Sequence, residues 1–214
     1  MQNARKYDAS ITVGAVPGQE DLVQLQGLGY RTLVDVRDEH ERFGGAVEKS
    51  AGKLGLRYTN ILAAREAIRT GDVRLFYETV FDPDATPVYA FSRYGKRPLA
   101  FLLIFDALRT GRTIHAIFSA AMRFGLSLEG DLTLRAFVVN ALNSGELRPI
   151  VDGIVERWPE LARRETPLSS APPRQGDEDE VQTALGEALQ IWATTRDREA
   201  LRKLLGNLCR LLEP

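Results

Sequence analysis

The stretch Pro87-Val-Tyr-Ala-Phe-Ser-Arg-Tyr-Gly-Lys-Arg-Pro-Leu99 decides the fold of this chain and points to its chemistry. Its apolar run, Val88 to Phe91, predicts a strand that ends abruptly in Ser92, a glycine and three cations. Pro98 then opens a long apolar stretch that predicts a helix, because proline suits the first helical position. Backbone N–H groups and the helix dipole favour an anion in front of a helix start. The stretch therefore predicts a strand, an anion-binding loop and a buried helix.

Strands and helices alternate along the chain up to this loop, and helices follow it. Strands are expected at 10–14, 32–36 and 56–62, and helices at 19–29, 46–54, 99–108 and 113–125. A further helix is expected to begin at Asp72 as its N-cap and to run through Phe81. Its inward face would carry Leu75, Phe76, Thr79 and Val80. The alternation predicts an α/β domain over residues 1–127, with a mostly parallel central sheet flanked by helices.

The pattern becomes all helical beyond that domain. Residues 128–162 are expected to form a helical extension with helices at 132–142 and 150–158. Residues 163–180 have the proline, serine and acidic composition of a linker. Residues 181–214 predict a helical hairpin with leucines at helical spacing. Because so apolar a hairpin has to pack on something, we expect it to provide a homodimer or protein-partner surface.

Composition excludes several classes of function. The balance of 28 basic and 29 acidic residues argues against nucleic-acid binding, which needs a basic excess. No apolar stretch is long enough to span a bilayer and no signal peptide is visible, so we expect a cytoplasmic protein without a membrane partner. The single cysteine, Cys209, excludes an internal disulfide. Because the chain has only two histidines, His40 and His115, in addition to this cysteine, we expect no metal site and no cofactor.

Four segments, taken in order, resemble the bacterial dual-specificity-phosphatase-like family. That family is also called the beta-lactamase-hydrolase-like phosphatase family and was earlier grouped with sulfur transferases. The resemblance covers residues 8–127 and rests on Val16-Pro-Gly-Gln-Glu-Asp-Leu22, Gly29-Tyr-Arg-Thr-Leu-Val-Asp-Val-Arg37, Leu56-Arg-Tyr-Thr-Asn-Ile-Leu62 and Pro87-Val-Tyr-Ala-Phe-Ser-Arg-Tyr-Gly-Lys-Arg97. It implies a cysteine-phosphatase-like fold, in which the loop reads Cys, two residues, Gly, one residue, Arg. Here Ser92 stands at the position of the nucleophilic Cys and Arg97 at that of the phosphate-clasping Arg, with Gly95 matching between them.

The serine changes the chemistry that the resemblance implies. A thiolate forms near neutral pH in a cationic loop at a helix start, whereas a serine hydroxyl stays protonated and needs a base. No histidine adjoins Ser92, since Phe91 precedes it, and nothing in the spacing supports a triad with His40 or His115. Pro98 also departs from the family, which commonly has Ser or Thr after the Arg.

The expected phosphate site is the loop itself, with backbone N–H groups and a bidentate Arg97 holding the anion. Its residues are Ser92, Arg93, Tyr94, Gly95, Lys96 and Arg97. Ligands of parallel sheets bind outside the carboxyl ends of strands, so Arg37 and Asp38 could form an edge of the pocket. The alternative for these two residues is a solvated strand end.

A general acid would be expected on a loop after the third strand, where Glu66 and Asp72 are the only carboxylates. Asp72 is more simply an N-cap, and Glu66 could belong to a solvated turn.

Three functions stay open on these grounds. The first is a catalytically impaired phosphatase-like protein that binds phosphate or a phosphorylated ligand in the loop and has a regulatory or partner-binding role. The second is an active cysteine-dependent tyrosine or dual-specificity phosphatase, represented here by a Cys-to-Ser variant at position 92. Phe91 and Pro98 favour the first, since one engineered change would not explain them. The third is a scaffold whose pocket is vestigial.

Overall fold

The computed structural model describes residues 4–42, 45–64 and 68–168 of the 214-residue chain. The expected hairpin at 181–214, most of the expected linker, the candidate acid Glu66 and Cys209 lie outside the described residues.

A five-stranded sheet forms the centre of the fold, in the order β1-β2-β5-β3-β4. Neighbouring strands are parallel except for β1, a short antiparallel edge strand that the sequence did not predict. The loop-bearing strand β5 lies in the middle, hydrogen-bonded to β2 on one side and β3 on the other. The strands are β1 (Arg5–Lys6), β2 (Ile11–Gly14), β3 (Thr32–Asp35), β4 (Arg57–Asn60) and β5 (Val88–Phe91). The predicted mostly parallel sheet is confirmed.

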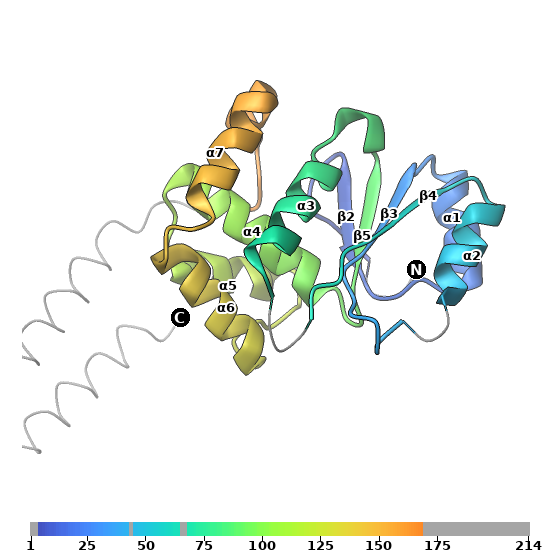
Figure 1. Ribbon diagram of the computed structural model, residues 1–214, viewed down its shortest axis with the longest axis horizontal. Coiled ribbons are helices and arrows are strands. Elements are labelled where there is room, and N and C mark those ends of the chain that lie inside the picture. The colour runs from blue at the N-terminus through green and yellow to red at the C-terminus, as the bar shows by residue number, and fades with distance from the viewer. Residues whose placement is uncertain (1–3, 43–44, 65–67, 169–214) are drawn as a thin grey trace, which may run out of the picture. The chain divides into compact units, whose positions relative to one another are not determined.

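Helices cover both faces of this sheet (Figure 1). α1 (Gln19–Gly27) and α2 (Ala46–Lys53) pack on one face, against Leu33, Tyr89 and Phe91. Alternate strand residues such as Val34, Val88 and Ala90 belong to the larger cluster on the opposite face, because side chains alternate along a strand. That cluster contains side chains of α3 (Thr70–Val80), α4 (Lys96–Thr110) and α5 (Ile114–Arg123).

Helix α4 is the central helix, as predicted, and every residue from Arg97 to Leu108 is buried. It begins at Lys96, directly after Gly95, so Pro98 occupies the third helical position rather than the first. Proline is tolerated there because N–H groups of the first turn have no partner within the helix. Gly111 ends α4, as the sequence predicts.

Helix α3 differs from its prediction in start and in orientation. It begins at Thr70, and Asp72 is not the N-cap but the third helical residue, whose carboxylate accepts a hydrogen bond from the Arg69 N–H at 3.1 Å. The expected inward residue Leu75 is 45% exposed. The buried face consists instead of Val73, Phe76, Tyr77 and Val80.

The helices beyond residue 127 share the core of the α/β part. α6 (Leu132–Asn143) and α7 (Arg148–Arg157) confirm the two predicted helices, and a 3-10 turn follows at Pro159–Arg163. Their buried side chains, such as Val138 and Val151, lie in the same cluster as those of β2 and β5. Leu168, within the expected linker, is also buried there. No helix in the described part of the chain is long and apolar enough to span a bilayer.

Candidate functional site

The loop after β5 lies at the carboxyl edge of the sheet, where the loops that follow β2, β3 and β4 also begin. Ser92 is 4% exposed, and its Oγ accepts a hydrogen bond from the Gly95 N–H at 3.1 Å. Gly95 has a φ of +80°, a conformation that favours glycine, and it turns the chain directly into α4. The nucleophile position is therefore buried in a tight turn at a helix N-terminus.

The three cations of the loop differ in their exposure and in their neighbours. Arg93 is exposed, and its guanidinium lies 5.2 Å from the ring centroid of Tyr94, which is itself exposed. Lys96 is half-buried and, with Tyr94, lines a hollow of about 500 Å³. The remaining lining residues come from the turn before α6 and from its first two residues: Gly130, Asp131, Leu132 and Thr133. Of these three cations only Arg97 is buried, so it is the one enclosed cation that the loop itself supplies.

Arg97 is held by the loop that follows β3. Its Nη1 donates to the Val36 carbonyl at 2.9 Å and to Glu41 Oε2 at 2.5 Å, and its Nη2 donates to Glu41 Oε1 at 2.9 Å. The sequence predicted Arg37 and Asp38 at an edge of this pocket but did not single out Glu41. The signal in the sequence was the excess of carboxylates after β3, which does not say which of them reaches α4.

Arg37 and Asp38 shape this loop. Arg37 donates to both carboxylate oxygens of the fully buried Asp35, from Nε at 2.8 Å and Nη2 at 2.7 Å. The Tyr58 hydroxyl donates to the same carboxylate at 2.6 Å. Burial by itself lowers the pKa of Arg37, but its hydrogen bonds to Asp35 raise that pKa above the ordinary value. Arg37 is therefore not the solvated strand end that was the alternative reading.

Burial, then the hydrogen bond to Asp35, raises the pKa of Tyr58 well above its usual range. The phenol thus stays protonated and donates to Asp35 throughout the physiological range. The cluster of Asp35, Arg37 and Tyr58 is a fixed support behind the loop that carries Glu41.

Among the described residues, Ser92 Oγ makes no hydrogen bond to a base or to a general acid. His40 is exposed in the turn after β3, and His115 makes a 3.3 Å hydrogen bond to the Ser119 hydroxyl on α5. The carboxylate of Asp72 is bonded to the Arg69 backbone. The described residues also contain no group of three or more His, Cys, Asp or Glu side chains that could hold a metal ion.

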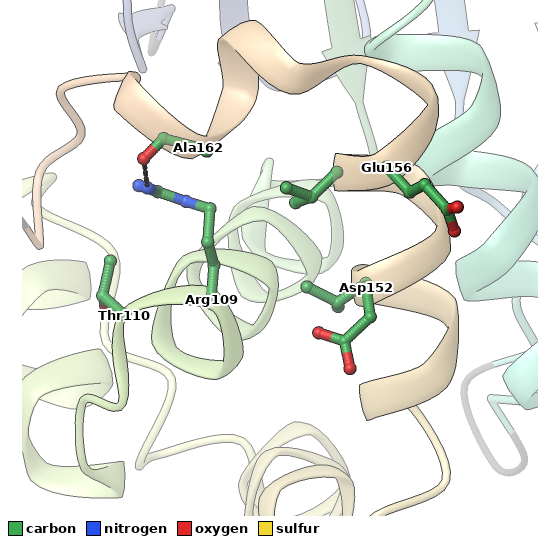
Figure 2. A pocket seen from close by; sticks show the side chains of 7 residues that line it. Arg109, Thr110, Asp152, Glu156 and Ala162 are labelled. Atoms are coloured by element: carbon green, nitrogen blue, oxygen red, sulfur yellow. Dashed lines mark hydrogen bonds between the residues drawn. The ribbon is translucent and has the colours of Figure 1, made fainter.

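A second hollow, of about 530 Å³, lies at the opposite end of α4 (Figure 2). Arg109 forms one wall and donates from Nη1 to the Ala162 carbonyl at 2.9 Å, which ties α4 to the 3-10 turn. Asp152 and Glu156 of α7 line the other side, and Figure 2 shows the Glu156 carboxylate directed away from the Arg109 guanidinium. Arg109 therefore has a structural role here, and this hollow is separate from the loop.

Comparison with known proteins relates this chain to others through structure alone. No protein-family model and no curated protein matches its sequence. The catalytic core of SIW14, a PP-IP phosphatase from S. cerevisiae in complex with citrate, is similar at a TM-score of 0.58 and 16% identity, over 71% of this chain and 92% of that one. A candidate phosphatase from Neisseria meningitidis is similar at a TM-score of 0.54 and 20% sequence identity, over 66% of this chain and 99% of that one. A variant of TpbA from P. aeruginosa in complex with pTyr is similar at a TM-score of 0.53 and 18% sequence identity, over 70% of this chain and 90% of that one. This chain thus has the phosphatase fold of these structures.

Proposed function

We propose that this chain binds a phosphate group, free or carried by a ligand, in the loop Ser92–Arg97. The observation that carries the proposal is the buried side chain of Arg97, the second residue of α4, which begins directly after the tight turn at Gly95. A helix N-terminus with an adjoining arginine suits a tetrahedral oxyanion, because N–H groups and a planar cation converge on it. Two of the similar structures hold anionic ligands, citrate and pTyr, which supports an anion for this loop.

We propose further that the site binds phosphate without turning it over. A phosphate ester is cleaved by this kind of loop only when a nucleophile is ionised or is deprotonated by a neighbour. The Ser92 hydroxyl has the Gly95 N–H as its hydrogen-bond partner among the described residues, and that group donates to the hydroxyl instead of removing its proton. A binding role, regulatory or in recruiting a protein partner, suits such a site.

The phosphatase fold favours a second candidate, an active cysteine-dependent phosphatase whose natural residue at position 92 is cysteine. Reading the codon for residue 92 in the natural gene separates the two. Cysteine there would make the enzyme the better proposal.

Titration of the full-length chain with inorganic phosphate, followed by calorimetry and by thermal unfolding, tests the proposed binding. We expect phosphate to raise the unfolding temperature, because a ligand of the folded state stabilises it by mass action. Arg97→Ala should weaken phosphate binding at least about tenfold, since hydrogen bonds to charged groups contribute roughly 1.5–3 kcal/mol. Arg74→Ala, which removes an exposed arginine of α3, is the control. Equal phosphate affinity in the Arg97→Ala variant and the wild type would refute the proposal.

Incubation with p-nitrophenyl phosphate tests the absence of turnover. We expect no release of p-nitrophenol above that of a Ser92→Ala variant. Release that depends on Ser92 would show that the hydroxyl acts as a nucleophile.

A further inference from the structure

We propose that Glu41 is a positioning residue for the anion site: it holds one edge of the Arg97 guanidinium and thereby leaves the other edge free for phosphate. This inference rests on the proposed phosphate binding. It assigns a role to a carboxylate that would otherwise seem misplaced in an anion site.

The hydrogen bonds of Arg97 divide its guanidinium into two edges. A guanidinium carries five N–H bonds in one plane. Nη1 uses both of its hydrogens, on the Val36 carbonyl and on Glu41 Oε2, and Nη2 uses one on Glu41 Oε1. Nε and the second hydrogen of Nη2 make no hydrogen bond to any described residue. These two parallel N–H bonds are the fork that matches two oxygens of a phosphate.

Glu41 is itself fixed by the loop around it. Its N–H donates to Asp38 Oδ1 at 2.9 Å, and its carbonyl accepts from Arg37 Nη1 at 3.1 Å. Arg37 is anchored in turn on the buried Asp35. The Glu41 carboxylate therefore presents a rigid pair of acceptors, and the side chains of Arg97 and Glu41 are only 8% and 21% exposed.

Two effects of the Glu41 carboxylate oppose each other. Its negative charge repels a bound phosphate. Its hydrogen bonds to Arg97 already restrict that side chain, so the arginine loses less conformational entropy when phosphate binds. Both carboxylate oxygens contact the edge opposite the free fork, where they do not compete with phosphate for N–H groups. We therefore expect positioning to outweigh repulsion.

Phosphate titration of full-length variants gives the first test. Glu41→Ala should weaken phosphate binding about fivefold to tenfold, the cost of ordering one freed arginine side chain. Glu41→Gln, which can still accept one N–H from Arg97, should lose less. Glu48→Ala removes an exposed carboxylate that pairs with Arg42 and should leave binding unchanged. Thermal unfolding without phosphate confirms that each variant is folded, and if Glu41→Ala is not, Glu41→Gln takes its place.

The second test asks whether Glu41 acts through the guanidinium. In an Arg97→Lys background there is no fork to orient, so only the repulsion by Glu41 is left. Glu41→Ala should then leave phosphate binding unchanged or tighten it, the reverse of its effect on the wild type. The same weakening in both backgrounds, or tighter binding when Glu41 is changed in the wild type, would overturn the inference.

The outcomes also separate this inference from the proposed function. Failure of the wild type to bind phosphate refutes the function. Phosphate binding that is lost in Arg97→Ala but untouched in both Glu41 variants refutes only the role of Glu41.

Discussion

Gly95 lies directly against the main chain of Gly14. A Cβ atom on Gly95 would come 2.9 Å from the Gly14 carbonyl oxygen and 3.0 Å from its carbonyl carbon. The turn that follows β5 is therefore seated on the end of β2, and no side chain fits between them. The shape of the anion site therefore depends on this contact between the turn and the end of β2.

Gly95→Ala should destabilise the fold and abolish phosphate binding. The left-handed conformation alone costs an alanine roughly 1–2 kcal/mol, and backbone atoms of Gly14 cannot move aside cheaply. Gly111→Ala is the matched control, because Gly111 has a φ of +70° with nothing within 4 Å of its Cβ position. Urea unfolding should show the larger loss for Gly95→Ala. Equal losses in the two variants would contradict the close approach.

Ser92→Cys should place a reactive thiol in the loop. The Gly95 N–H already points at this position, and the helix start and Arg97 favour an anion there, so the thiol should ionise below the usual pKa of about 8.5. The rate of alkylation by iodoacetamide as a function of pH gives that pKa. The wild type, whose only cysteine is Cys209, provides the background rate. A thiol that titrates at or above its usual pKa would show that the loop does not stabilise an anion.

A buried carboxylate in α4 makes the stability of the chain depend on pH. Asp106 is 2% exposed and accepts hydrogen bonds from the Tyr7 hydroxyl and from Arg109. Burial raises its pKa from 3.8 to about 6, although the Tyr7 hydrogen bond and Arg109 act in the opposite direction. Between these pH values the folded state holds a proton that the unfolded state has released.

The contribution of Asp106 to the free energy of unfolding should therefore be fully present below about pH 4 and lost as the pH rises through about 6. A shift of about two pKa units corresponds to about 3 kcal/mol of unfolding free energy. In Asp106→Asn this loss should disappear, so the stability of the variant relative to the wild type should rise between pH 4 and 7. Urea unfolding of both proteins across that range measures it. Parallel pH profiles would show that Asp106 does not titrate as described.

Val138→Ala tests whether the helices after residue 127 are part of the main core. Val138 of α6 is fully buried in the same cluster as the strands. The variant should lower the unfolding free energy by about 2 kcal/mol, because methyl groups lost from a core leave a cavity. Leu132→Ala, at a position that is 78% exposed, is the control and should have little effect. A Val138→Ala variant as stable as the wild type would contradict the shared core.

The sequence was most informative where local pattern and tertiary structure coincide. The apolar run of β5, the glycine at position 95 and the apolar stretch of α4 predict the strand, the turn and the buried helix. Asp106 is a lone carboxylate within that apolar helix, a pattern that could have indicated a buried acid. In α3, the helical period fits two overlapping faces that share Phe76, one with Leu75 and the other with Tyr77. Periodicity therefore did not decide which of the two faces is buried in the core.

Local sequence pattern does not predict contacts between segments that lie far apart in the sequence. Glu41 meets Arg97 across 56 positions of sequence, and several neighbouring carboxylates looked equally suitable. The central position of β5 depends on strand pairing, which no single segment encodes. The start of α4 at Lys96 was missed because a proline in the third position reads like a proline in the first.

The central position of β5 also sets how slowly the loop can open. Val88–Phe91 is hydrogen-bonded to a strand on each side, and α4 is buried along most of its length. Segments of this kind exchange their amide protons with solvent only when the whole domain unfolds. The four-residue turn at 92–95 joins two such segments, and its Ser92 and Gly95 N–H groups are bonded to the Gly14 carbonyl and to Ser92 Oγ, so its backbone should be preformed for an arriving anion.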